Sequence, residues 1–184
     1  MRIVGGRFGG RRLAGPKSDR VRPTSDRTRE SLFNILSGRL DLAGKRVIDL
    51  FAGTGALGLE ALSRGAAYAL FVDDSAEGRA LLRTNIEQLG LQGSTRIFRR
   101  DATRLGPCGN MLPYDMAFLD PPYGRELGVR ALAALREGRW LTQDAIIVLE
   151  ESAAAMPAEV EGYEMLDNRI YGDTAIAILS PLQT

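Results

Sequence analysis

The sequence predicts a doubly wound α/β fold, in which helices cover both faces of a mostly parallel β-sheet. Short apolar runs typical of buried strands alternate along residues 46–149 with longer stretches whose apolar residues have helical spacing. Acidic residues stand in or just after four successive runs, and a glycine-rich turn follows the first run. This alternation is typical of parallel strands that are joined by helices.

Composition favours one soluble domain and excludes several kinds of chemistry. The chain has 184 residues, 45% of them hydrophobic and 26% charged, and no apolar stretch long enough to span a membrane. The N-terminus lacks a signal-peptide pattern and the single cysteine, Cys108, permits no internal disulfide, so we expect a cytoplasmic protein. The absence of histidine excludes Ser-His-Asp and Cys-His catalysis, and we expect no metal cofactor.

Positive charge is concentrated near the N-terminus. Residues 1–46 hold 12 Lys+Arg against 4 Asp+Glu, whereas residues 47–184 hold 12 against 19, which gives a net charge of +1. A basic segment on a mildly acidic body indicates a polyanionic partner. Arginine suits such a partner because its planar guanidinium grips phosphate. We therefore predict RNA contacts from Arg7, Arg11, Arg12, Arg22, Arg27 and Arg29.

The first 40 residues are expected to form an N-terminal extension. Ile3-Val4 and Arg12-Leu13 are predicted to pair as a short hairpin around a group of glycines. Thr24 or Ser25 can cap a helix whose apolar residues then recur at helical spacing as far as residue 40. We expect two parts in the chain: a basic arm and helix (residues 1–40) and a cofactor-binding domain (residues 41–184).

From residue 46 onward strands and helices alternate regularly. Apolar runs of four to six residues predict strands, and longer amphipathic stretches predict the helices between them. Two final segments alternate like strands around Tyr171-Gly172-Asp173, which predicts a C-terminal hairpin. The expected strands are 47–50, 68–73, 95–98, 114–119, 145–149, 161–170 and 174–179, and the expected helices are 56–64, 76–91 and 129–135.

The glycine-rich turn predicts a nucleotide-type ligand. Gly53-x-Gly55-x-x-Gly58 matches the dinucleotide fingerprint, and Asp73 lies 20 residues after Gly53, where a ribose-binding acid is expected. Asp49, in the strand before the turn, would repel a pyrophosphate and attract a cation. This acid favours S-adenosylmethionine, which carries a sulfonium and an ammonium group, over NAD.

Four acids, one for each of four successive strands, are expected to face one crevice at the carboxyl edge of the sheet. Asp73 would accept hydrogen bonds from the ribose hydroxyls, and Asp101 would accept one from the adenine amino group beside the Ala102 backbone. Either Asp73 or Asp74 can meet the ribose, and Asp73 is preferred because it ends its strand. The predicted cofactor-binding residues are Asp49, Phe51, Ala52, Gly53, Thr54, Gly55, Asp73, Asp101 and Ala102.

Asp120-Pro121-Pro122-Tyr123, after the fourth strand, is predicted to be the catalytic loop. The prolines stiffen the chain, so the Pro121 carbonyl is held in a fixed direction. That carbonyl and Asp120 can accept the two hydrogens of an exocyclic amine and orient its lone pair toward a methyl group. Tyr123 offers a flat face on which a base can stack. No strong base is required, because the amine becomes acidic only after transfer, so positioning and electrostatics would supply most of the rate.

These motifs resemble those of the amino-group methyltransferases that use S-adenosylmethionine. Asp-Leu-Phe-Ala-Gly-Thr-Gly at the first strand and Asp-Pro-Pro-Tyr after the fourth carry this likeness. Residues 22–36, 55–66 and 171–174 resemble more narrowly the bacterial 16S rRNA (guanine-N2)-methyltransferases of the RsmD type. The resemblance extends over nearly the whole chain.

The resemblance implies a Rossmann-like class I methyltransferase fold: a seven-stranded, mostly parallel sheet with an antiparallel last strand and a small N-terminal extension for RNA. It implies transfer of a methyl group from S-adenosylmethionine, with S-adenosylhomocysteine as product, to N2 of a specific guanine in 16S rRNA. The substrate would be the small ribosomal subunit or an assembly intermediate, and the target base would be splayed into the Tyr123 pocket. We expect a monomer.

Three other functions remain open at this point. Asp-Pro-Pro-Tyr serves adenine-N6 as well as guanine-N2, so methylation of adenine in DNA or RNA is the main alternative. An NAD-dependent dehydrogenase fits the glycine spacing, but Asp49 and the absence of histidine disfavour it. A non-catalytic RNA-binding protein is disfavoured by the intact Asp120–Tyr123 motif.

Overall fold

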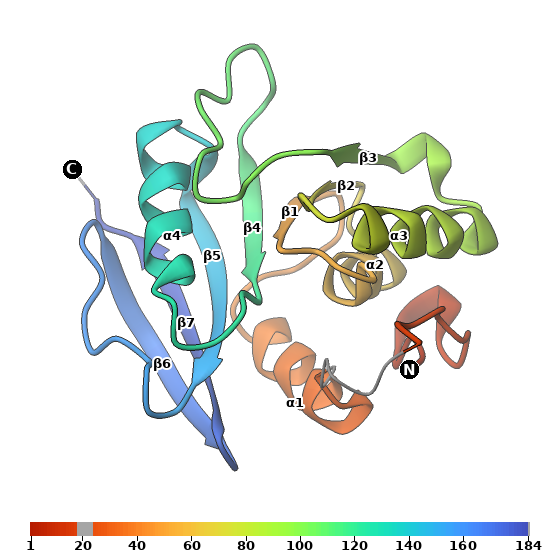
Figure 1. Cartoon of the computed structure of the whole chain (residues 1–184), viewed down its shortest axis with the longest axis horizontal. Helices are drawn as coiled ribbons and strands as arrows, with labels where there is room; N and C mark the ends of the chain where they lie inside the picture. Colours follow the sequence, from red (N-terminus) through yellow and green to blue (C-terminus); the bar gives the residue numbers. More distant parts are fainter. Residues whose placement is uncertain (18–23, 184) are drawn as a thin grey trace.

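A seven-stranded mixed β-sheet forms the centre of the molecule (Figure 1). The structure is a computed structural model that describes residues 1–17 and 24–183. Its strand order is β3-β2-β1-β4-β5-β7-β6. The strands are β1 (Arg46–Leu50), β2 (Tyr68–Val72), β3 (Thr95–Phe98), β4 (Tyr114–Leu119), β5 (Leu141–Ser152), β6 (Tyr163–Tyr171) and β7 (Thr174–Pro181).

The strand directions confirm the doubly wound sheet with an antiparallel last strand. β1 pairs in parallel with β2 and β4, β2 with β3, and β4 with β5. β7 runs antiparallel to both of its neighbours, β5 and β6. The order of connection reverses between β1 and β4, and open α/β sheets bind their ligands beyond the carboxyl ends of the strands at such a reversal.

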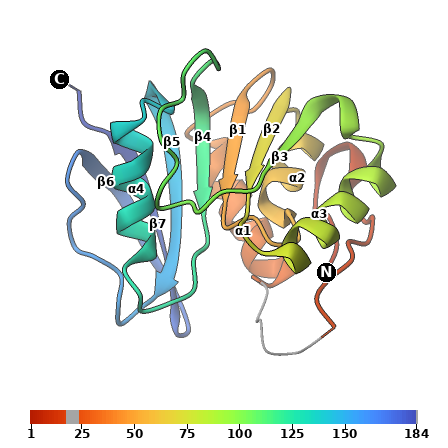
Figure 2. The same ribbon diagram turned by 45° about the horizontal axis from the view of Figure 1, so that its top comes forward.

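Helices cover both faces of the sheet (Figures 1 and 2). On one face, the helices after the arm, after β1 and after β2 share a core with Phe71 and Phe118. On the other face, the helix after β4 and the segment between β3 and β4 share a core with Leu70 and Leu119. Within the described ranges, no helix is long and apolar enough to cross a membrane. The first three helices are α1 (Asp26–Ser37), α2 (Ala56–Ser63) and α3 (Ala76–Leu89), and α4 (Leu127–Glu137) covers the second face.

Helix ends follow local capping chemistry. The Ser25 side chain accepts a hydrogen bond from the Thr28 N–H and so caps α1, as one of the two predicted capping residues. Ser75 caps α3 in the same way through the Gly78 N–H, and Gly90, with φ of 68°, ends that helix. The predicted elements are therefore present, with ends that differ by a few residues.

The largest difference in length is in β5, which was predicted to end at residue 149. The strand continues through Ser152, because β7 pairs with Glu150, Glu151 and Ser152 in antiparallel register. A polar strand end buried by a neighbouring strand leaves no signal in apolar periodicity. This longer strand places the carboxylates of Glu150 and Glu151 at the carboxyl end of β5, between β4 and β7.

The arm is a folded part of the domain. In place of the predicted pairing of Ile3-Val4 with Arg12-Leu13, the structure has a single antiparallel bridge between Arg2 and Arg12. The Ile3 N–H donates to the Arg11 carbonyl at 2.9 Å, and a short 3-10 turn, η1 (Gly6–Phe8), occupies the loop. Ile3 and Leu13 are buried in the core that also contains α1, α2 and α3.

A buried carboxylate anchors this arm to α2. Glu60 is fully buried and accepts hydrogen bonds from the backbone N–H groups of Val4 and Gly5, both at 2.9 Å. The same carboxylate pairs with Arg64 at 2.9 Å and lies 3.8 Å from the Arg29 guanidinium. A charge removed from water requires such partners, so the arm, α1 and α2 are joined at one point.

A second buried carboxylate holds the glycine turn against its helix. Asp49 on β1 accepts a hydrogen bond from the Gly58 N–H at 2.9 Å. A Cβ atom at Gly58 would lie 2.4 Å from the Phe71 ring, so glycine allows α2 to pack closely on the sheet. Burial raises the pKa of Asp49 to about 8, and the nearby Asp73 carboxylate also raises it. Asp49 is thus a proton-binding group in the folded protein.

The single tryptophan lies deep in the α4 face of the core. Trp140 is fully buried, and its indole Nε1–H donates to the Gly106 carbonyl at 2.8 Å. Its ring stacks near that of Tyr114, with 6.2 Å between the centroids. This cluster closes the core where the connection after β3 meets α4.

Removing the Glu60 carboxylate should destabilise the protein strongly. Glu60→Ala leaves two partly buried N–H groups and Arg64 without their acceptor and removes one of the two carboxylates that pair with Arg29. Breaking a buried ion pair in this way costs about 3–5 kcal/mol. Urea unfolding followed by circular dichroism measures the change. The matched control, Glu87→Ala on the exposed side of α3, should change the free energy of unfolding by less than about 0.5 kcal/mol. Equal effects of the two variants would contradict the anchoring role.

Asp49→Asn should flatten the dependence of stability on pH. The folded protein keeps Asp49 protonated up to about pH 8, whereas the unfolded chain ionises it near about pH 4. Wild-type stability should therefore fall as the pH rises from about 4 to about 8, because the folded state binds more protons. Asparagine still accepts the Gly58 N–H, so the variant should lose less stability over this range. Urea titrations near these two limits measure the slope, with exposed Asp144→Asn as control; parallel slopes for Asp49→Asn and wild type would refute the assignment.

Candidate active site

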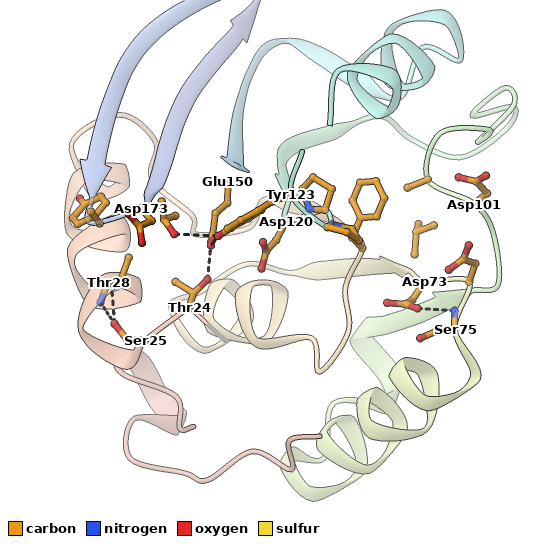
Figure 3. A pocket seen from close by; sticks show the side chains of 18 of the residues that line it. Thr24, Ser25, Thr28, Asp73, Ser75, Asp101, Asp120, Tyr123, Glu150 and Asp173 are labelled. Atoms are coloured by element: carbon orange, nitrogen blue, oxygen red, sulfur yellow. Dashed lines mark hydrogen bonds between the residues drawn. The ribbon is translucent and has the colours of Figure 1, made fainter. Parts of the chain in front are cut away.

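A cavity of about 850 Å³ opens at the carboxyl ends of the parallel strands, at the reversal between β1 and β4 (Figure 3). Its walls come from the loops that follow β1, β2, β3 and β4, from the end of β5, from the start of α1 and from the β6–β7 turn. The lining residues include Phe51 after β1, 73–75 after β2, 100–102 after β3, 120–123 after β4, Glu150 at the end of β5, Thr24, Ser25 and Thr28 at α1, and 171–174 at the turn.

Most of the predicted catalytic and cofactor-binding residues are brought together in this cavity. Phe51, Asp73, Asp101, Ala102 and the whole segment 120–123 line it. The other predicted cofactor-binding residues lie in β1 and the turn behind Phe51 and are not part of the wall; they are Asp49, Ala52, Gly53, Thr54 and Gly55. Contact between these five and a cofactor stays a prediction.

Asp73 connects the glycine turn to the cavity. One of its carboxylate oxygens accepts the Gly53 N–H at 2.7 Å, and the other accepts the Ser75 N–H at 2.8 Å. Asp74 also lines the cavity but is exposed. Phe51 has a φ of 57°, which is rare for an aromatic residue and is typical of functional turns. Asp73, the acid directly after β2, thus holds the turn that contains this strained residue.

Asp101 stands at the same end of the cavity (Figure 3). Its carboxylate accepts hydrogen bonds from the Thr103 N–H at 2.8 Å and the Thr103 hydroxyl at 2.7 Å. These two bonds lower the pKa of Asp101, so the side chain is charged at neutral pH. Ala102 is buried beside it and forms part of the wall.

The cavity carries an excess of negative charge. Among the described lining residues, six are acidic and only Arg100 is basic. Arg100 donates to the Leu105 carbonyl at 2.9 Å. Such a lining attracts a cationic ligand and repels a pyrophosphate. The acids are Asp73, Asp74, Asp101, Asp120, Glu150 and Asp173.

Asp120 faces the cavity with a free carboxylate. Within the described residues no donor forms a hydrogen bond to its side chain, although the group is partly buried. Burial raises the pKa of Asp120 well above its usual range, and the neighbouring charges of Glu150, Asp49 and Glu151 raise it further. Pro121 is buried directly after it. The acceptors of Asp120 are therefore available to a ligand that brings its own donors.

Tyr123 lies next to Glu150 and Asp120 and lines the cavity (Figure 3). Its hydroxyl donates to Glu150 and lies 3.2 Å from the Thr174 hydroxyl. Burial and the hydrogen bond to Glu150 raise the pKa of Tyr123, so the phenol stays neutral. Tyr123 as a whole remains 41% exposed, so a base can approach it from the cavity.

Glu150 lines the cavity but was not among the predicted site residues, and neither were Thr24, Ser25, Thr28, Ser75, Arg100 and residues 171–174. The second oxygen of Glu150 accepts a hydrogen bond from the Thr24 hydroxyl at 2.6 Å, so the N-terminal extension reaches into the cavity. A nearby bond of 3.1 Å between the hydroxyls of Tyr171 and Ser31 joins the β6–β7 turn to α1. The signal available in the sequence was the pair of acids, Glu150-Glu151, at the end of an apolar strand.

The predicted RNA-binding arginines differ in their exposure to solvent. Arg7, Arg11 and Arg12 are exposed on the arm, and Arg27 is exposed on α1 beside a shallow groove of about 420 Å³. Arg22 lies outside the described residues. Contact of these arginines with RNA stays a prediction.

Arg29 corrects the prediction, because it is a buried structural residue. Its side chain is 1% exposed and its guanidinium donates to Asp26 at 2.8 Å and to the Thr24 carbonyl at 3.1 Å. It also donates to the Arg2 carbonyl. All of these partners belong to the extension, so Arg29 holds the arm to α1 and offers nothing to a phosphate.

Comparisons with known proteins agree with this architecture. A family model described as Conserved hypothetical protein 95 matches residues 1–180. Ribosomal RNA small subunit methyltransferase D of Escherichia coli is 36% identical over 178 residues, which cover 95% of this chain and 87% of that protein. YlbH of Bacillus subtilis is 34% identical over 181 residues, which cover 97% of each chain.

A solved structure has the same fold over its whole length. The Escherichia coli protein yhhF aligns with a TM-score of 0.84 at 31% identity, covering 98% of this chain and 97% of that chain. The resemblance read from the Asp-Pro-Pro-Tyr and glycine-turn motifs is thereby confirmed. The chain therefore belongs to the RsmD family of rRNA methyltransferases.

Proposed function

We propose that the protein transfers a methyl group from S-adenosylmethionine to the exocyclic N2 amine of a guanine in 16S rRNA of the small ribosomal subunit. The observation that carries the proposal is that Asp73, Asp101 and the segment Asp120–Tyr123 face one acidic cavity. The name of the Escherichia coli relative, which specifies the small-subunit RNA, supports the substrate class.

The described residues fit this cofactor better than a dinucleotide. The cofactor supplies a methyl group activated on a sulfonium centre, and it carries net positive charge at that end. The acids Asp73 and Asp101 would hold its ribose and adenine, and the excess of carboxylates suits its charge. Asp49 and the glycine turn would support the ammonium end from behind Phe51.

The catalytic loop acts by positioning the acceptor amine. The Asp120 carboxylate and the Pro121 carbonyl would accept its two hydrogens, which aims the nitrogen lone pair along one direction. The Tyr123 ring would stack on the base while Glu150 and Thr174 hold its hydroxyl. A cationic ligand and an amine donor both favour the ionised form of Asp120 in the loaded site.

The N-terminal extension would hold the RNA. The start of α1 forms part of the cavity wall, and the arm and α1 carry exposed arginines that would bind phosphates of the RNA. Because this surface is small, the natural substrate would be a protein-bearing subunit or an assembly intermediate, with the target base splayed out.

Radiolabelled methyl transfer tests the proposal directly. Small subunits from a strain that lacks the enzyme are the acceptor, and nucleoside analysis with mapping identifies the product and its position. N2-methylguanosine at one site is the expected result. N6-methyladenosine would instead favour the adenine reading, and greater methylation of naked 16S rRNA than of subunits would contradict the assigned substrate.

Asp120→Ala should abolish transfer and keep cofactor binding. The variant removes one of the two acceptors that position the amine, and loss of a group of this kind lowers kcat by about 100-fold or more. Labelled transfer to small subunits measures the rate, and calorimetry measures S-adenosylmethionine affinity. Exposed Asp144→Ala is the control that should keep full activity. An Asp120→Ala enzyme that works at the wild-type rate would remove this residue from the mechanism.

Arg7→Gln combined with Arg12→Gln should weaken RNA binding and its salt dependence. Each phosphate contact that is lost reduces the slope of log K against log salt by about 0.7–0.9. Binding of 16S rRNA or subunits at several salt concentrations measures the slope. The control pairs Arg130→Gln with Arg139→Gln, two exposed arginines on and after α4, a helix of the opposite sheet face. A slope that changes equally in both double variants would show that the arm has no special role.

A further inference from the structure

Asp120 and Glu150 stand side by side because of strand register. In the parallel pair of β4 and β5, Leu119 lies opposite Leu149, so the next residue on each strand is an acid. Leu119 and Leu149 both belong to the core on the α4 face. Successive side chains alternate between the faces of a sheet, so both acids point toward the opposite face, where α1 lies.

Glu150 is held as an acceptor that points into the cavity. Its side chain is only 6% exposed and yet lines the cavity beside Asp120 (Figure 3). One oxygen accepts the Tyr123 hydroxyl and the other accepts the Thr24 hydroxyl at 2.6 Å. A carboxylate has about four acceptor positions, so two remain after these bonds.

The two acids have no cationic partner among the described residues. No salt bridge there includes Asp120 or Glu150, although each acid is wholly or partly removed from water. Neighbouring buried carboxylates repel each other unless donors are supplied to them. A ligand with two adjacent N–H groups would provide these donors.

The Watson–Crick edges of guanine and adenine differ in whether they present two adjacent N–H donors. Guanine presents N1–H beside the N2 amine, so two donors stand next to each other. Adenine presents the N6 amine beside N1, which is an acceptor and would face a carboxylate lone pair. A pair of fixed acceptors thus fits guanine and repels adenine, because a buried acceptor that faces another acceptor is left unpaired.

We propose that Glu150 accepts the N1–H of the target guanine while Asp120 accepts one N2–H, and that this pair of acceptors selects guanine over adenine. The inference rests on the function proposed above and adds the residue that reads the base. Tyr123 and Thr24 orient the carboxylate for this purpose, so the catalytic loop and the N-terminal extension both act on base selection.

A base analogue separates base reading from mere bracing of Tyr123. 2,6-Diaminopurine keeps the 2-amino group but presents an acceptor at N1 in place of N1–H. Small subunits are assembled with 16S rRNA that carries either guanine or this analogue at the mapped target position. Methyl transfer to the 2-amino group is then measured as kcat/KM by nucleoside mass spectrometry.

The wild-type enzyme should prefer guanine over the analogue by about 100-fold or more, since a site built to accept a hydrogen bond rejects a base that lacks the donor. Glu150→Gln should slow transfer to guanine and reduce this preference at least about 10-fold, because the glutamine amide can donate to N1 of the analogue. The affinity of Glu150→Gln for S-adenosylmethionine, measured by calorimetry, should equal that of wild type. This result would verify that the fold and the part of the cavity that contains Asp73 and Asp101 are intact.

Two further variants complete the design. Tyr123→Phe removes the hydroxyl that Glu150 accepts but keeps the carboxylate, which Thr24 still orients, so it should slow both bases and reduce the preference for guanine less than Glu150→Gln does. Glu159→Gln, an exposed glutamate in the loop after β5, should behave as wild type throughout.

The outcomes separate the two proposals. If wild type forms N2-methylguanosine and Glu150→Gln keeps the full preference for guanine, Glu150 does not read the base and the inference fails while the proposed function stands. The same holds if Tyr123→Phe and Glu150→Gln have identical effects on both bases. If the wild-type product is N6-methyladenosine, or if no base is methylated, the proposed function itself fails.

Discussion

The parallel register of β1, β4 and β5 is the constraint on which the site depends. Leu50 lies opposite Leu119, and Leu119 opposite Leu149, so the three strands deliver their ends to one line. A slip of one residue would turn Asp120 and Glu150 to the α4 face and bury them in an apolar core. The apolar pattern of each strand sets its register, because a change of register would expose the apolar side chains. The register in turn decides toward which face the acid after each strand points.

The N-terminal extension is built into this framework. Glu60 binds the arm backbone, Arg29 binds the arm to α1, and Thr24 reaches Glu150 in the cavity. The start of α1, which lies in the segment predicted to be an RNA-binding extension, thus forms part of the wall of the candidate active site. The buried charges of Glu60 and Arg29 join the arm to α2 and α1, and the segment that leads into α1 contacts Glu150. Folding of the arm therefore supports the part of the cavity that contains Asp120 and Glu150.

Sequence reasoning reached the fold and the part of the cavity formed by the loops after β1 to β4, because both depend on local signals. Apolar periodicity located the strands, and the acids Asp73, Asp101 and Asp120 stood where parallel strands end. What it missed depends on tertiary neighbours. Arg29 was predicted to contact RNA because burial by the arm leaves no local trace, and Glu150 was overlooked because its strand is extended by pairing with β7. The register predicted for the N-terminal hairpin was wrong for the same reason. Its glycines permit several pairings, and the observed one buries Ile3 and Leu13 in the core.

The position of Trp140 has an optical consequence. The only indole in the chain is sealed in the α4 face of the core, against Tyr114 and Gly106, whereas the acceptor pocket opens toward α1. Its emission will therefore report whether the sheet and α4 are assembled and will be insensitive to a base that enters beside Tyr123. A fluorescence titration of this protein is consequently a measure of foldedness, and ligand occupancy has to be followed through a label on the nucleic acid or on the cofactor.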